Sequence, residues 1–184
     1  ETKPDTVRVG IYITSIHNID FKEKEYSINF WLWLKYKNKA FDFFKNLEVP
    51  QAKTVEKSFS TIDTSGETVY MQMKLQCVMK DSWRIANFPF DHQTLRLSFE
   101  NSQFDTRYLV FEADTVGNHF DPRFTLRGWS IDSCTISTGT KIYGLMHDSC
   151  NLASATLQND LAKYISQITF EFTPQDGHLA DGYE

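Results

Sequence analysis

The feature that most constrains the fold of this chain is an alternation of apolar and polar side chains that recurs along its length. In residues 69–79, VYMQMKLQCVM, every second side chain from Val69 to Met79 is apolar, while most of those between are polar. Successive side chains of an extended strand point to opposite faces, so a period of two predicts a half-buried β-strand. Further strands are predicted in residues 7–14, 28–36, 94–100, 109–113, 128–137 and 164–172.

Residues 28–36, INFWLWLKY, carry two tryptophans on the face that would otherwise meet water. One parity of this segment is apolar throughout: Ile28, Phe30, Leu32, Leu34 and Tyr36. The other parity holds Asn29 and Lys35 together with Trp31 and Trp33. A pair of large exposed apolar side chains suggests an interface, and Trp is favoured at interface centres. The alternative is that a neighbouring strand or loop of the same chain covers both tryptophans.

Turn-forming residues separate the predicted strands at 17–20, 64–67, 87–91 and 115–122. Many short strands joined in this way predict an all-β fold, an antiparallel immunoglobulin-like β-sandwich with Greek-key connections. Residues 40–47 have the apolar spacing of one or two helical turns, and the Ala- and Leu-rich residues 152–163 fit either a helix or a mobile loop. The length of 184 residues predicts one domain that spans residues 1–184.

Composition excludes some functions and partners. The net charge of −5 gives no support to a nucleic-acid partner. No apolar run approaches the roughly 20 residues that span a bilayer, and there is no signal peptide. Both a mature soluble protein and an excised domain fit these features.

The three cysteines differ in their expected state. Cys77 lies on an apolar parity and is expected to be a buried thiol, whereas Cys134 and Cys150 could pair across a hairpin of an exported protein if the geometry allows it.

Motifs of catalysis are absent from the sequence. There is no G-x-S-x-G nucleophile elbow, no phosphate-binding glycine loop and no metal-ligand spacing among the five histidines. The sequence therefore predicts that the protein is not an enzyme.

One loop offers oxygen ligands for a metal ion. The stretch DTVGNHFD holds Asp114, Asn118 and Asp121, and oxygen ligands of this kind suit Ca²⁺. The alternative is a polar turn whose Asn and Asp side chains bond their own backbone, since the EF-hand spacing is absent. Apart from this Ca²⁺, no cofactor is expected.

Four stretches of the chain are similar to one family. Residues 88–95, FPFDHQTL, resemble an F-P-F-D-x-Q motif, and residues 28–41 resemble a strand whose aromatic side chain faces a ligand. Gly128 and Trp129 match a G-x-W or G-W strand, and residues 164–172 resemble the last strand before a membrane helix. In this order and approximate spacing, over about residues 7–173, the chain resembles the extracellular domain of pentameric ligand-gated ion channels, the Cys-loop receptors.

The departures from the family pattern are specific. The two cysteines of the eukaryotic receptors would fall at Asp81 and Leu95, so the sequence resembles the prokaryotic members. The stretch after residue 41 is short and lacks the family's W-x-P motif. An aromatic that the family often has after the proline loop falls near Ser102, with Phe104 close by. Residues 141–164 take the place of the ligand-capping loop, with only two aromatics, Tyr143 and Tyr164, in matching places.

The resemblance implies a ring of five identical subunits on the periplasmic or extracellular face of a membrane, with a transmembrane domain of the same chain outside this segment. A small-molecule ligand would bind between subunits, and the residues that match such a site are Trp31, Phe104, Tyr143 and Tyr164. An amine is one candidate ligand, because a cation is attracted to an aromatic face. Trp33 has no such match and is expected to pack structurally or to line the inner surface of the ring.

The loop that contacts the membrane domain and transmits gating in the family would comprise Phe88, Pro89, Phe90 and Asp91.

Other functions remain open at this point. The short middle segment and the TPQDGH ending fit an accessory or sensor β-sandwich of another membrane protein. Exposed tryptophans also suit the stacking of sugars in a soluble carbohydrate-binding module, and a hydrolase is a formal alternative.

Overall fold

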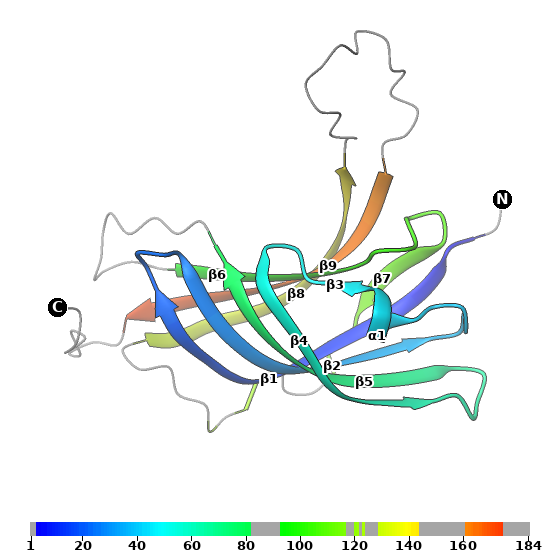
Figure 1. Ribbon diagram of the computed structural model, residues 1–184, viewed down its shortest axis with the longest axis horizontal. Helices are drawn as coiled ribbons and strands as arrows, with labels where there is room; N and C mark the ends of the chain where they lie inside the picture. Colours follow the sequence, from blue (N-terminus) through cyan, green and yellow to red (C-terminus); the bar gives the residue numbers. More distant parts are fainter. Residues whose placement is uncertain are drawn as a thin grey trace, which may run out of the picture.

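Two β-sheets packed face to face form the fold (Figure 1), in a computed structural model that describes residues 3–81, 93–116, 120–121, 123, 129–143 and 161–174. The described elements are β1 (Asp5–Asp20), β2 (Glu25–Tyr36), α1 (Phe43–Asn46), β3 (Leu47–Glu48), β4 (Ala52–Asp63), β5 (Val69–Lys80), β6 (Gln93–Asn101), β7 (Leu109–Ala113), β8 (Trp129–Tyr143) and β9 (Leu161–Pro174).

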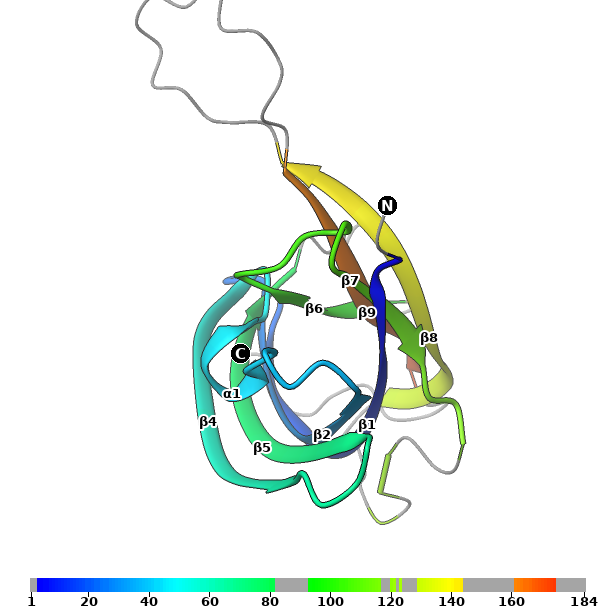
Figure 2. The ribbon, with the colours of Figure 1, turned by 90° about the vertical axis from the view of Figure 1, so that its right-hand side faces the viewer.

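One sheet has the strand order β4-β5-β2-β1-β7 and the other the order β3-β6-β9-β8. The predicted all-β sandwich is therefore confirmed. Neighbouring strands are antiparallel except for β1 and β7, which pair in parallel from Asp5 opposite Leu109 to Val9 opposite Ala113. Figure 2 shows the two sheets along the sandwich, with the ends of β8 and β9 reaching away from it.

The core lies between the sheets and consists of the predicted apolar parities. Its strand residues include Val7, Val9, Ile11, Ile13, Ile28, Phe30, Leu32, Leu34, Tyr36, Val69, Met71, Met73, Leu75, Cys77, Met79, Leu95, Leu97 and Phe99. Phe30 and Phe99 contact each other from opposite sheets, with ring centroids 5.6 Å apart. Removal of this apolar surface from water drives the sheets together. The alternation of residues 164–172 falls on β9, for which the structure describes the backbone alone.

The predicted turn at residues 17–20 is wrong. β1 continues to Asp20, with irregular pairing between His17 and Asp20, and Asn18 has a φ of 51°. Asn tolerates this left-handed conformation, so the residues that looked like a turn form a bulge within the strand. The chain reverses directly after Asp20, in a turn at residues 21–24. There the Asp20 carboxylate accepts a hydrogen bond of 2.9 Å from the backbone N–H of Glu23.

The predicted helix at 40–47 is confirmed in shortened form as α1. Asp42 caps it by accepting a hydrogen bond of 3.0 Å from the backbone N–H of Lys45.

Of residues 152–163, those from Leu161 onward belong to β9, and the others lie outside the described residues. No helix in the described part of the chain combines the length and the apolar character that a membrane crossing requires.

The cysteines of the described region are free thiols. Cys77 is buried, as predicted, and burial raises the pKa of its thiol to about 12. Cys134 lies within β8 opposite Phe170, and burial raises the pKa of its thiol to about 11. The third cysteine, Cys150, lies outside the described residues.

Candidate functional site

The outer face of the five-stranded sheet brings an aromatic and a basic residue together. Across β1, β2, β5 and β4, strand pairing places Tyr12, Trp31, Lys74 and Ser58 in one row. Lys74 reaches back over Trp31, with its ammonium nitrogen 5.9 Å from the centre of a ring of the indole. At that distance the cation and the π-electrons attract each other.

Phe59 completes this group from the edge strand β4. Its ring meets that of Trp31 edge to face, with centroids 6.0 Å apart and planes at 85°. The side chain of Phe59 is nevertheless 71% exposed, whereas Trp31 is half-buried. We call Trp31, Phe59 and Lys74 the Trp31 cluster. It is a surface patch with two aromatic rings and one positive charge.

The backbone at Phe59 is strained. Its φ of 51° lies in the left-handed region, which a bulky side chain rarely adopts. The pairing of β4 with β5 shifts between Ser58 and Ser60, so Phe59 is the extra residue of a β-bulge. Such conformations cost of order 1–3 kcal/mol and concentrate at functional sites. An exposed ring held at this cost is a reason to look for a ligand at the Trp31 cluster.

Trp33 lies two residues further along the same face of β2 but has a different environment. Its indole Nε1–H donates a hydrogen bond of 3.0 Å to Oδ2 of Asp114, just after β7. The ring covers Gly10 of β1 so closely that a Cβ atom there would lie 2.2 Å from Cε2 of Trp33. These contacts agree with the first of the two predicted environments of Trp33, structural packing, and a place on the inner surface of a ring stays a prediction.

Asp114 holds this second group together. Its carboxylate is 3.5 Å from the Lys35 ammonium and accepts a hydrogen bond of 3.3 Å from the backbone N–H of Val116. The hydrogen bond from Trp33 is the main reason why the pKa of Asp114 lies below its ordinary value, and burial opposes the shift. Only 5% of Asp114 is exposed. The carboxylate therefore serves to fix the loop after β7 onto β2.

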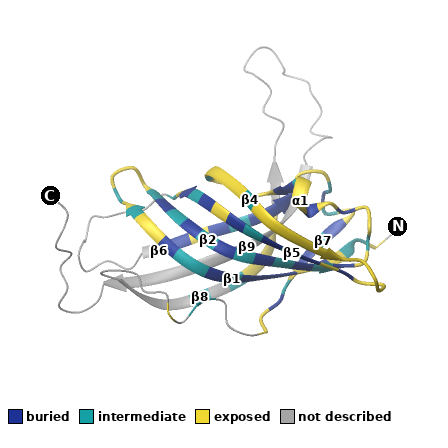
Figure 3. Ribbon diagram, turned by 60° about the horizontal axis from the view of Figure 1, so that its bottom comes forward, coloured by how far each residue is buried: buried dark blue, intermediate teal, exposed yellow. Residues whose placement is uncertain are grey.

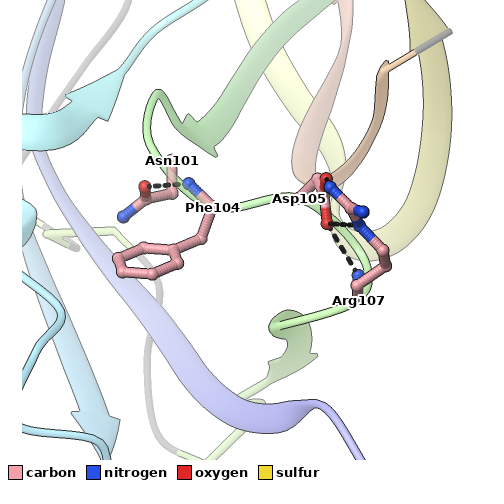
Figure 4. Close-up of polar contacts among 4 residues, drawn as sticks. All are labelled: Asn101, Phe104, Asp105 and Arg107. Atoms are coloured by element: carbon pink, nitrogen blue, oxygen red, sulfur yellow. Dashed lines mark hydrogen bonds and ion pairs between the residues drawn. The ribbon is translucent and has the colours of Figure 1, made fainter. Parts of the chain in front are cut away.

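Phe104 contributes to a local aromatic cluster rather than to the Trp31 cluster. Its ring centroid lies 4.9 Å from that of Phe41, a core residue, and 5.9 Å from that of Tyr108. Asn101 fixes the backbone by accepting a hydrogen bond of 3.0 Å from the N–H of Phe104 (Figure 4). The loop around Phe104 is thus a packed structure of its own.

The same loop continues into an ion pair between Arg107 and Asp105. The guanidinium of Arg107 donates two hydrogen bonds to the carboxylate of Asp105, one from Nη2 at 2.6 Å and one from Nε at 3.0 Å (Figure 4). Arg107 also lies over the ring of Tyr108, 5.6 Å from its centroid, and Tyr108 is about half exposed. An arginine and a tyrosine are therefore presented to solvent on the side of the molecule near β7.

The remaining predicted ligand-binding residues lie in the other sheet. Tyr143 ends β8 opposite Leu161, and Tyr164 of β9 pairs with Thr140. The structure describes their backbone alone, in the part of β8 and β9 that reaches away from the sandwich (Figure 2). Trp31 and Phe104 have different aromatic partners, and Trp31 lies in a different sheet from the two tyrosines. A shared site for all four stays a prediction.

The predicted coupling loop, Phe88, Pro89, Phe90 and Asp91, lies outside the described residues. Its flanks are described. Asp81 accepts a hydrogen bond of 3.1 Å from the backbone N–H of Arg96 and lies 3.7 Å from the guanidinium of that residue. Asp81, directly after β5, is therefore joined to β6 by polar contacts with Arg96, the neighbour of Leu95.

The predicted calcium ligands have protein partners. Besides the contacts of Asp114, the carboxylate of Asp121 accepts a 2.8 Å bond from the guanidinium of Arg123, which holds the pKa of Asp121 at about 2. Asn118 lies outside the described residues, and within the part of the chain that the structure describes no three His, Cys, Asp or Glu side chains group around a metal position. The calcium site stays a prediction.

A groove lies at the open edge of the sandwich, between α1, β3 and β4. It has a volume of about 700 Å³ and is lined by Phe44, Leu47, Glu48, Val49, Pro50, Val55, Lys57 and Glu100. The Lys57 ammonium donates to the backbone carbonyls of Phe44 and Leu47, at 2.9 and 2.8 Å, and its burial lowers its pKa. Lys57 therefore ties β4 to the end of α1.

Sequence reasoning did not identify Phe59 or Lys74. Phe59 belongs to β4, which has no continuous alternation because the bulge shifts its parity and because most of the strand is exposed (Figure 3). Lys74 was visible only as one polar residue of a half-buried strand. Its place beside Trp31 depends on the register between β2 and β5, which the sequence pattern alone does not specify.

Comparison with known proteins gives one negative and one positive result. No protein-family model matches the sequence. The chain is 25% identical to the proton-gated ion channel of Gloeobacter violaceus, in an alignment that covers 72% of this chain and 43% of that channel. This chain thus corresponds to less than half of the length of that relative. That relative is an ion channel and not an enzyme.

Proposed function

We propose that this chain is the extracellular ligand-sensing domain of a pentameric ligand-gated ion channel. The similarity to a proton-gated channel and the β-sandwich fold support this proposal. The observation that carries the ligand-sensing part is the Trp31 cluster, in which a strained bulge presents an exposed aromatic ring beside Trp31. In this proposal the pore belongs to a part of the protein outside this segment, and the domain faces the periplasm or the exterior.

The distribution of the candidate residues is consistent with a ligand site between two copies. Trp31 lies on the outer face of one sheet, whereas Tyr143 and Tyr164 lie in the other sheet. In a head-to-tail ring, each copy presents one flank to the previous copy and the opposite flank to the next. Trp31 of one copy then faces the β8–β9 side of its neighbour.

Protons are a second stimulus to weigh, because the relative is named for proton gating. The carboxyls in the described region whose pKa departs clearly from its ordinary value are Glu25, Asp63, Asp114 and Asp121, and each pKa is lowered. A lowered pKa favours the ionised form, so none of these four carboxyls is tuned to take up a proton in mild acid.

The test begins with the gene. We expect the sequence beyond residue 184 to encode four apolar segments, each long enough to span a bilayer. The full-length protein, purified in detergent, should contain five copies by native mass spectrometry and should conduct ions in planar bilayers. A reading frame that ends without an apolar segment, or a full-length protein that is monomeric, would refute the proposal. A sugar-binding module would instead bind immobilised polysaccharides, and that binding would be lost in Trp31→Ala.

A further inference from the structure

We infer that the ligand of the Trp31 cluster is an organic anion with a flat apolar body, such as an aromatic carboxylate. The inference deepens the proposed function and rests on it for the role of the site. It follows from the charge beside Trp31: the Lys74 ammonium already lies over the indole, 5.9 Å from the ring centre. A cationic ligand beside the same ring would meet a like charge, so the site disfavours the amine that an aromatic patch alone would suggest.

Within the described part of the chain, the Lys74 ammonium differs from those of Lys35, Lys53 and Lys80 on the same sheet because no acidic side chain pairs with it. Lys35 pairs with Asp114, and both Lys53 and Lys80 pair with Glu25. Among the residues that the structure describes, no carboxylate lies within 4.0 Å of the Lys74 ammonium. The chain as a whole carries a net charge of −5, so an unpaired cation on this face marks the place where an anion is best received.

The aromatic rings define the rest of the ligand. Phe59 stands at the edge of the sheet, 71% exposed, with its ring perpendicular to that of Trp31. A flat apolar body packed in this corner covers both rings, and a carboxylate attached to it reaches the three N–H donors of Lys74. The strain at Phe59 is explained in the same way, because the bulge turns its ring toward Trp31.

The experiment compares three probes that share one ring and differ in charge: para-fluorobenzoate, para-fluorobenzamide and para-fluorobenzylamine. Each is titrated with the full-length protein that carries this chain, and binding is measured from the broadening of its fluorine NMR line. We expect the benzoate to bind more tightly than the neutral amide by roughly fivefold, the upper range of an exposed ion pair. The protonated amine should bind most weakly. High salt should reduce the differences.

Variants identify the source of this preference. Lys74→Gln should bring the ratio of benzoate to benzamide affinity to about 1, which is the value expected without a charge contribution. The matched control is Lys39→Gln, which removes one positive charge from an exposed position near β2 and should leave the ratio unchanged. Phe59→Gly relieves the strained φ and removes one ring, so it should weaken all three probes alike while the protein stays folded. Trp31→Ala should abolish binding of all three.

Several results would overturn the inference. These are an amine bound as tightly as the benzoate by the unaltered protein, an equal effect of Lys39→Gln and Lys74→Gln, or binding of the probes that Phe59→Gly and Trp31→Ala both leave intact. No measurable binding of any probe would do the same. The outcome is separable from that of the proposed function: a protein that conducts ions but ignores the charge series disproves only the ligand class. A protein that binds the benzoate through Lys74 but encodes no membrane segment disproves only the channel.

Discussion

Trp31 and Trp33 lie on the same face of β2, two residues apart, yet their side chains contact different parts of the molecule. Trp33 leans toward β1 and β7, where it covers Gly10 and donates a hydrogen bond to a buried carboxylate. Trp31 leans toward β5 and β4, where it meets the exposed ring of Phe59 and the ammonium of Lys74. Both indoles are half-buried, but Trp33 is held by contacts with its own chain, whereas Trp31 lies beside an exposed ring and a positive charge. Their difference separates a structural side chain from a candidate binding side chain.

The largest expected effect concerns the packing of Trp33 on Gly10. Gly10→Ala places a Cβ atom where the indole of Trp33 now lies, 2.2 Å from Cε2, so the ring has to move and lose its bond to Asp114. We expect the free energy of unfolding to fall by about 3 kcal/mol, as for severe overpacking. Urea denaturation measures it. A companion change, Trp33→Ala in the Gly10→Ala background, should cost less than the sum of the two single changes, and strict additivity would show that the two residues do not interact.

The next effect tests the hydrogen bond alone. Trp33→Phe keeps an aromatic ring over Gly10 but removes the N–H that Asp114 accepts. A hydrogen bond to a charged group contributes about 2 kcal/mol, so the free energy of unfolding should fall by roughly that amount. Thermal denaturation of the two proteins provides the comparison. Equal stability would mean that Lys35 and the backbone N–H of Val116 satisfy the carboxylate without the indole.

The pH dependence of stability sharpens the same comparison. The pKa of Asp114 in the folded protein lies below its ordinary value of 3.8, mainly because of the bond from Trp33. The unfolded chain therefore takes up the proton first as the pH falls, so the stabilisation is complete above about pH 5 and is lost as the pH falls through the folded pKa. Asp114→Asn should lower stability at pH 7 by about 1 kcal/mol and flatten its decline in this acid range. Denaturant titrations at several pH values check this, and an unchanged slope would assign the stabilisation to other groups.

The smallest effect on folding is expected for a change at Trp31. Trp31 is half-buried and contacts an exposed ring, so Trp31→Ala should reduce the free energy of unfolding by less than about 1 kcal/mol. Its effect on ligand binding or on assembly should be the larger one. Urea denaturation and the copy number by native mass spectrometry measure the two sides. A loss of about 3–5 kcal/mol, the size of a core deletion, would show that Trp31 is a structural residue like Trp33.

Much of the fold was predictable because burial leaves a simple pattern in the sequence. A strand with one face in the core shows a period of two, and the strands of this kind, such as β2 and β5, were recognised with the correct inward parity. Two features were not predictable from local pattern. β4 is an exposed edge strand with a bulge, so no continuous parity marks it, and the Asn18 bulge in β1 has the residue types of a turn.

The candidate site was predictable in part. The exposure of two tryptophans on one face followed from alternation, and the resemblance to a channel domain singled out Trp31 as ligand-facing. Phe59 and Lys74 did not follow, since one sits in the missed strand and the other becomes a neighbour of Trp31 only through the pairing of β2 with β5. Phe104 was expected near a ligand, and the structure places it against Phe41 and Tyr108.

Alternation alone predicts which face of each long strand enters the core, because the pleat of a strand sends alternate side chains to opposite sides and water excludes the apolar ones. The same alternation puts two tryptophans together on the outer face of β2. Their different surroundings arise only from the way the strands are arranged in the fold. The carboxylate that holds Trp33 comes from a residue 81 positions further along the chain, whereas the partners of Trp31 arrive from a strained bulge and a neighbouring strand. Contacts between segments so far apart depend on strand register and sheet order, which no local pattern encodes.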